Sequence, residues 1–118
     1  MILEDLEIYQ IALKISDLAW DIYKTLPKEF RYTTNQQFLD ASDSIGANIS
    51  EGYGRFHYKD SLKFYYNSRG SLYEADFWLN RLRKRELVKL KLYEEMQSLI
   101  DTEKFKLNNF INSIKSKI

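Results

Sequence analysis

The stretch Ser44–Arg55, SIGANISEGYGR, decides the fold of this chain. Ile45 and Ile49 are four residues apart, so on a helix they lie on the same face. Gly52 and Gly54 follow, and a glycine in the position of Gly54 is typical of a left-handed residue that ends a helix. The stretch therefore predicts the second half of an amphipathic helix that ends near residue 53.

Apolar residues at spacings of three and four continue on both sides of this stretch and predict further helices. Pro27 ends the first one, because proline disfavours helical geometry in the residue before it. The 118 residues include one proline and four glycines, and no strand-like alternation is bounded by turns. We therefore predict an all-α, antiparallel up-down-up-down four-helix bundle in a single domain, 1–118. The expected helices cover about residues 4–26, 34–53, 59–83 and 90–115.

Charge is unevenly placed along the chain. The net charge is only +1, but residues 1–58 hold 9 acids and 5 Lys/Arg, whereas residues 59–118 hold 8 acids and 13 Lys/Arg. This distribution favours an oriented surface or self-association over uniform coating of nucleic acid. The chain has no cysteine, no run of roughly 20 apolar residues and an acidic N-terminal segment. We expect a soluble, cytoplasmic protein without disulfides or a membrane span.

The residues that usually carry catalysis are scarce. His57 is the only histidine, so neither a catalytic triad nor a histidine metal cluster can form within one chain. Metal sites in helical bundles use Glu-x-x-His pairs, and none is present. The segment 52–55 closes a helix, whereas a phosphate-binding glycine loop follows a strand and opens a helix. We expect no catalytic residue, no metal, no cofactor and a non-enzymatic role.

Polar residues flank the apolar stripes of the second and third helices. An unpaired buried polar group costs roughly 1–3 kcal/mol, so these residues are expected to find partners among themselves. We predict a buried polar network that fixes the register of the helices. Its members are Asn48, Glu51, Arg55, Arg69, Ser71 and Glu74.

A basic cluster lies at the end of the third expected helix. Its members are Arg81, Arg83, Lys84, Arg85, Lys89 and Lys91. Cations at a helix C-terminus interact favourably with the helix dipole, so a solvated helix end is one interpretation. The other is a nucleic-acid-binding patch for phosphate groups, with Tyr93 nearby to stack on a base. We leave both interpretations open.

The first and third helices each carry a second apolar stripe. A wide core face is one explanation, and a subunit interface is the other. We favour the interface, because a monomer would otherwise expose a large apolar patch. The interface residues that we predict are Tyr9, Trp20, Tyr23, Phe64 and Trp78.

Motifs in residues 44–55 and 68–74, together with residues 5–9, resemble the four-helix-bundle proteins encoded in intervening sequences of bacterial large-subunit rRNA genes. That family is sometimes labelled a ribosomal protein. The resemblance implies a homo-oligomer, typically a pentameric ring, with no established catalysis. The related accessory proteins of diversity-generating retroelements are similar in fold and bind nucleic acid and a reverse transcriptase through a basic surface.

Two functions follow as hypotheses. The first is a non-enzymatic oligomeric bundle associated with structured RNA, which the basic cluster and the family resemblance favour. The second is an oligomeric scaffold or adaptor for a protein partner with no direct contact to nucleic acid. The surplus aromatic stripes and the nearly neutral net charge favour this alternative.

Overall fold

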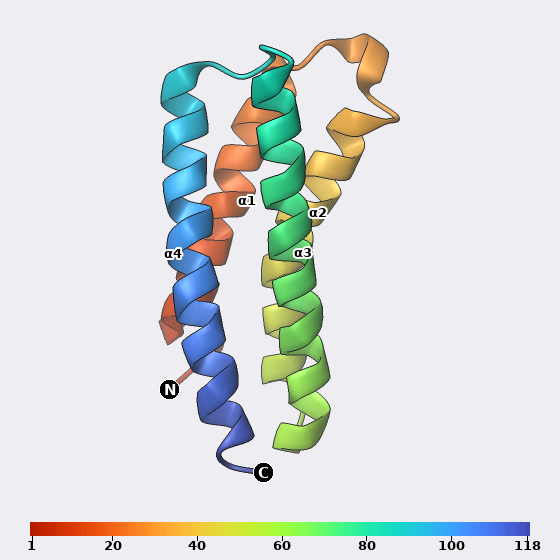
Figure 1. Cartoon of the computed structure of the whole chain (residues 1–118). Coiled ribbons are helices and arrows are strands. Elements are labelled where there is room, and N and C mark those ends of the chain that lie inside the picture. The colour runs from red at the N-terminus through yellow and green to blue at the C-terminus, as the bar shows by residue number, and fades with distance from the viewer.

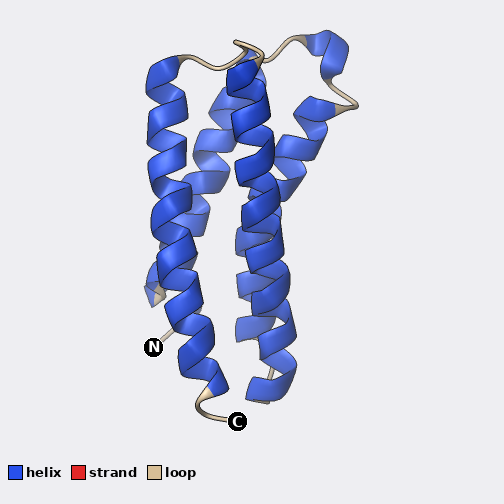
Figure 2. Ribbon diagram, in the orientation of Figure 1, coloured by secondary structure: helices blue, strands red, loops and turns tan.

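The computed structural model describes residues 1–118 as four long helices without a strand (Figure 1, Figure 2). The prediction of an all-α fold with four helices is therefore confirmed. The elements are the 3-10 turn η1 (Leu3–Asp5), α1 (Glu7–Thr25), the 3-10 turn η2 (Lys28–Phe30), α2 (Thr34–Tyr53), α3 (Tyr58–Lys84) and α4 (Leu90–Lys115). Both termini lie at one end of the bundle, and the α1–α2 and α3–α4 connectors lie at the other end (Figure 1).

One hydrophobic core runs through the bundle, and all four long helices contribute to its 24 buried residues. Ile15, Ile45, Leu72 and Ile100, one from each helix, have no exposed surface. Burying an aliphatic side chain stabilises a fold by roughly 1.5–3 kcal/mol. The apolar positions at spacings of three and four are thus the residues that hold the four helices together.

Small residues bring α2 and α3 close together along the stretch that decides the fold. The Ser68 hydroxyl of α3 donates a hydrogen bond of 2.8 Å to the carbonyl oxygen of Ile45 in α2. A β carbon added at Gly52 would lie 2.7 Å from a ring carbon of Tyr65. Gly52 is therefore explained by the close approach of Tyr65.

Two helix ends differ from the expectation. The first long helix begins at Glu7 rather than near residue 4, because Leu6 has an extended backbone that separates η1 from α1. Gly54 has a φ of −75°, so it is not the left-handed residue that we expected. Its amide still donates to the Ser50 carbonyl oxygen at 3.2 Å, the bond of a regular helix. The chain therefore leaves α2 without a left-handed cap.

Candidate nucleic-acid interface

The basic cluster surrounds the turn between α3 and α4, at the end of the bundle away from the termini (Figure 1). Five of its six members are exposed, whereas Arg83 is half-buried. The exposed residues, which we call the basic turn, are Arg81, Lys84, Arg85, Lys89 and Lys91.

A left-handed residue shapes this turn. Glu86 has a φ of 61°, and it is the only residue other than glycine with a positive φ. The Leu87 amide reaches back to the Leu82 carbonyl oxygen at 3.0 Å, and the Glu86 amide to that of Arg83 at 2.9 Å. This pattern is that of a helix that ends with a left-handed residue, a position that glycine usually fills. In this turn a glutamate, Glu86, holds that position.

Arg83 has a structural role in the turn. One guanidinium nitrogen donates a hydrogen bond of 2.7 Å to the carbonyl oxygen of Val88. The guanidinium carbon also lies 6.0 Å from the centre of the Tyr93 ring. We predicted Arg83 as a phosphate-binding residue, but the structure engages it in contacts that close the turn. We therefore leave it out of the basic turn.

The cations of the basic turn have no acidic partners. The chain contains four ion pairs, and all four join residues outside the basic turn. Glu86, the one acid in the same segment, forms no ion pair. Neighbouring cations repel one another, and this repulsion is relieved when a polyanion binds. The arrangement is therefore suited to binding an anion with several charges.

Two further cations lie at the same end of the bundle. Lys28 and Arg31, in and beside η2, are exposed and form no ion pair. A hollow of about 230 Å³ joins η2 to the α3–α4 turn, and its lining residues are Phe30, Thr34, Arg85 and Leu87. Sequence reasoning missed Lys28 and Arg31 because they are about 50 residues away in the chain. The expected order of the helices could have revealed Lys28 and Arg31, because an up-down bundle brings its first and third connectors to the same end.

The predicted buried network around Glu51 does not form. The Glu51 side chain is 59% exposed and pairs only with Arg55, at 3.4 Å. Asn48 donates to the Ser44 carbonyl oxygen within its own helix, whereas Arg69 donates to Asn108 of α4. Ser71 and Glu74, the other predicted members, form no side-chain hydrogen bond with these residues. The prediction was wrong because Glu51 lies on the solvent side of α2, where no polar partner is required.

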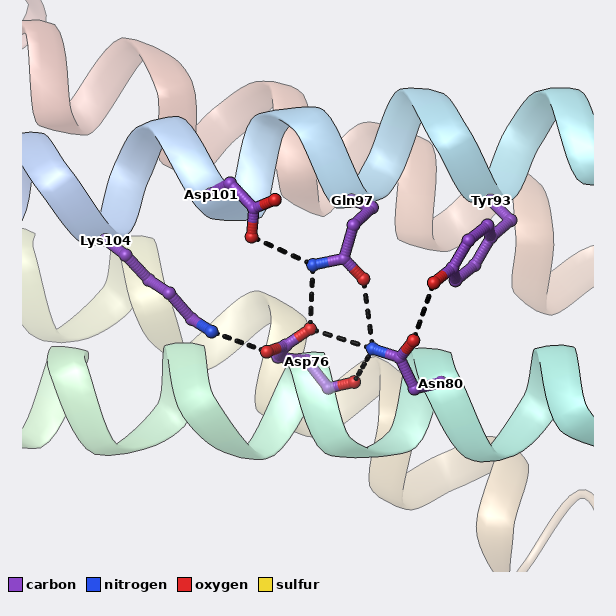
Figure 3. A network of polar contacts seen from close by, with 6 residues as sticks. All are labelled: Asp76, Asn80, Tyr93, Gln97, Asp101 and Lys104. Carbon is purple, nitrogen blue, oxygen red and sulfur yellow. Dashed lines mark hydrogen bonds and ion pairs between the residues drawn. The ribbon is translucent and has the colours of Figure 1, made fainter.

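The extended polar network instead links α3 to α4 (Figure 3). Its centre is Asp76, whose carboxylate accepts hydrogen bonds from Asn80 and Gln97 and forms an ion pair with Lys104. Gln97 also donates to Asp101, and the Tyr93 hydroxyl donates to Asn80. The network members are Asp76, Asn80, Tyr93, Gln97, Asp101 and Lys104. These contacts fix the position of α4 along α3, the role that we had assigned to the Glu51 group.

Most of the residues predicted for a subunit interface have packing contacts within the single chain. Tyr9, Tyr23 and Trp78 are partly buried and pack against the core, and Phe64 lies under the Arg55 guanidinium at 4.6 Å. Only Trp20 has half of its surface exposed. The second stripe thus contributes to the core of the single chain, and the subunit interface stays a prediction.

One acid is buried in the core. Glu103 of α4 has no exposed surface, and neither carboxylate oxygen has a hydrogen-bond partner. The pKa of this carboxyl is raised from 4.5 to about 8, chiefly by burial and also by the Glu7 carboxylate, while the Lys106 ammonium opposes the rise. No group of three or more His, Cys, Asp and Glu side chains is placed to hold a metal ion. None of the helices has the length and apolarity that crossing a membrane requires.

A four-helix bundle with unpaired cations at one end is the class of protein that these observations define. The model of the family described as 23S rRNA-intervening sequence protein matches residues 4–109. The chain belongs to this family, as its motifs predicted.

The fold is shared with a solved structure. It is the crystal structure, at 1.70 Å resolution, of a protein with unknown function from the S23 ribosomal protein family of Bacteroides thetaiotaomicron VPI-5482. The two chains are 23% identical, with a TM-score of 0.81, and the match covers 88% of this chain and 97% of that chain. A search of curated proteins found no match.

Proposed function

We propose that this protein is a non-enzymatic bundle that binds structured RNA through the basic turn. The observation that carries the proposal is a group of five exposed cations without ion-pair partners, in a chain whose net charge is only +1. The family description, which names 23S rRNA, supports the same class of partner. The proposal places the protein in the cytoplasm and requires no cofactor.

The physical basis is the phosphate backbone. Lysine and arginine side chains that contact phosphates release condensed counterions, so binding weakens as the salt concentration rises. Side chains cannot read the deep, narrow major groove of an RNA helix, and proteins recognise paired RNA mostly by shape and by phosphate and 2′-hydroxyl contacts. Flexible lysines and arginines on an exposed turn suit that kind of recognition.

The proposal includes an antiparallel up-down-up-down course of the helices and assembly into a homo-oligomer, with the pentameric ring that the family resemblance implies.

One exposed face of α3 is a candidate contact surface for assembly. It carries four exposed residues at helical spacing: Tyr66, Gly70, Tyr73 and Phe77. Glycine inside a helix is roughly 0.8–1.0 kcal/mol less favourable than alanine. Nothing in this chain lies within 4 Å of a β carbon added at Gly70. Close packing of a second copy on this face would account for the glycine.

Assembly would also strengthen RNA binding. Each copy adds one basic turn, and linked binding sites raise the overall affinity without any new contact. A ring therefore turns five cations per chain into a larger surface for one RNA.

The second candidate function is an oligomeric scaffold for a protein partner. The observation that favours it is the same aromatic face of α3, because Tyr73 and Phe77 are more than half exposed. In that case the basic turn is only a solvated helix end. RNA binding by the purified protein separates the two candidates.

The test reverses three charges of the basic turn with Arg81→Glu, Lys84→Glu and Arg85→Glu. The matched control carries Lys59→Glu, Lys63→Glu and Lys115→Glu, which change the same number of exposed cations toward the opposite end of the bundle. A fluorescently labelled RNA hairpin is titrated with each protein at two salt concentrations. Arg83 is left intact in both variants, because its removal would disturb the turn.

We expect the basic-turn variant to lose binding while the control keeps it. The slope of log affinity against log salt should fall by roughly 0.7–0.9 for each lost phosphate contact. Helix content and oligomer mass should stay unchanged in both. Equal affinities of the two variants, or no binding by the wild type at low salt, would overturn the RNA proposal and favour the scaffold.

A further inference from the structure

A small hollow lies between the end of α1, η2 and the start of α2. Its volume is about 210 Å³. Its lining residues are Trp20, Tyr23, Lys24, Leu26, Lys28, Arg31 and Asn35. These segments lie at the end of the bundle that also holds the α3–α4 turn (Figure 1). The hollow is therefore at the same end as the basic turn but involves different residues.

Two stacked aromatic rings form one side of the hollow. The ring centres of Trp20 and Tyr23 are 5.6 Å apart, and the ring planes differ by 19°. Tyr23 packs against the core, whereas Trp20 is 50% exposed. A tryptophan supported by a second ring offers a flat and partly fixed surface. Such surfaces bind flat ligands by stacking, and nucleic-acid bases are the common example.

The charged residues that line the hollow are all cations. Lys24 pairs with Asp21 at 3.5 Å, whereas Lys28 and Arg31 form no ion pair. No acidic residue is among the lining residues. A ligand for this site should therefore carry negative charge beside its flat ring.

Asn35 provides an unused hydrogen-bond acceptor. The residue is 2% exposed, and its amide nitrogen donates to the Pro27 carbonyl oxygen at 2.8 Å. The side-chain oxygen has no hydrogen-bond partner. A buried acceptor without a partner costs roughly 1–3 kcal/mol. An N–H group on a ligand in the hollow would remove that cost.

We propose that this hollow binds one nucleotide, with its base stacked on Trp20 and its phosphate on Lys28 and Arg31. An N–H group of the base would donate to Asn35. The volume is below the roughly 300–1,000 Å³ of sites for drug-sized ligands, so it suits a single ring system. The inference deepens the RNA-binding proposal and rests on it for the source of the nucleotide. That source is an unpaired nucleotide of the bound RNA. A free nucleoside monophosphate offers the same two groups, a base and a phosphate.

The experiment compares three probes: a hairpin with unpaired adenosines in its loop, a fully paired duplex of equal length, and AMP alone. Binding of each labelled RNA is measured by fluorescence anisotropy. Trp20 is one of two tryptophans, so Trp78→Phe leaves it as the only tryptophan, which is excited selectively at wavelengths that tyrosine does not absorb. Quenching of its emission then reports stacking directly, and circular dichroism checks that the variant is folded.

We expect the loop RNA to bind more tightly than the duplex and to quench Trp20. Base stacking contributes roughly 1–3 kcal/mol, which corresponds to about 5- to 150-fold in affinity. Trp20→Ala should remove this preference without changing affinity for the duplex. Phe105→Ala is the matched control, because Phe105 is an exposed aromatic of α4 that does not line the hollow. It should leave the preference intact.

The outcomes distinguish this inference from the RNA proposal. Loop and duplex RNA bound equally, with Trp20→Ala like wild type, would overturn the nucleotide site and leave binding by the basic turn intact. Quenching by AMP but not by RNA would support the site and assign its ligand to the free nucleotide. A change of oligomer mass in Trp20→Ala, with the loop preference kept, would assign Trp20 to a subunit interface and overturn the site.

Discussion

The guanidinium of Arg83 donates a hydrogen bond to the carbonyl oxygen of Val88, across the turn that joins α3 to α4. Val88 is buried, and the residues between the two partners include left-handed Glu86. The bond therefore holds the turn in the conformation that exposes its neighbours, Lys84 and Arg85. One cation of a basic cluster stabilises the turn, and the others remain available for a ligand.

We predict that Arg83→Ala lowers the free energy of unfolding by roughly 1–3 kcal/mol, because it leaves the Val88 carbonyl oxygen without its charged donor. Lys84→Ala, one residue away and exposed, should stay within about 0.5 kcal/mol of wild type. Urea denaturation followed by circular dichroism measures both. Equal stability of the two variants would contradict the structural role of Arg83.

The second prediction contrasts Asp76 with Glu51. Asp76→Ala should destabilise the bundle by roughly 1–3 kcal/mol, since it removes the acceptor of Asn80 and Gln97 and the partner of Lys104. Glu51→Ala should change stability by less than about 0.5 kcal/mol, because its single ion pair is exposed. Thermal unfolding of both variants under one condition is the measurement. A larger loss of stability in Glu51→Ala than in Asp76→Ala would contradict this assignment and favour the network predicted around Glu51.

The third prediction concerns Gly70. Gly70→Ala should stabilise an isolated chain by roughly 0.5–1 kcal/mol, because the new methyl group meets nothing and alanine favours the helix. In an oligomer that packs on this face, the same change should weaken self-association. Denaturation measures the change in stability, and analytical sedimentation of the same sample measures self-association. Unchanged oligomer mass over a dilution series would place the interface elsewhere.

The fourth prediction follows from the buried carboxyl of Glu103. The folded protein keeps its proton up to about pH 8, because burial raises the pKa, whereas the unfolded chain releases it near 4.5. The stability from this group is therefore complete below pH 4.5, falls as the pH rises from 4.5 to 8, and is constant above that. The loss amounts to roughly 3–5 kcal/mol across that window.

Glu103→Met tests this assignment, because methionine replaces the carboxyl with an apolar group of similar length. The variant should be more stable than wild type at pH 8 and should lose the part of the pH dependence that Glu103 causes. Chemical denaturation at pH 5, 7 and 9 compares the two proteins. Parallel stability curves would show that Glu103 is not the titrating group.

The helices and the core could be predicted from the sequence. Ile45 and Ile49 are fully buried, as their spacing predicted, because a helix in water is stabilised chiefly by packing one apolar face. The exact helix ends were less predictable. Gly54 at the end of α2 lacks the left-handed conformation that we expected, whereas Glu86 after α3 adopts it. The backbone hydrogen bonds of the α3–α4 turn outweigh the local preference of a glutamate there.

The candidate site was only partly predictable. The exposed cations of the basic turn are neighbours in the sequence, so the cluster was visible there. Lys28, Arg31 and Asn35 belong to a distant segment that only the packing of the helices brings to the same end. Their proximity depends on which connectors share an end, and a single local pattern does not contain that information.

By itself the sequence determined the class of fold, the apolar core and the place of a basic cluster, because each depends on local spacing along a helix. Tertiary structure decided which polar groups are buried. Glu51 and Asp76 are both acids near apolar stripes, yet Glu51 faces solvent and Asp76 faces Lys104 of another helix. That difference depends on how each helix is rotated against its neighbours, and the rotation is set by the packing of the whole core.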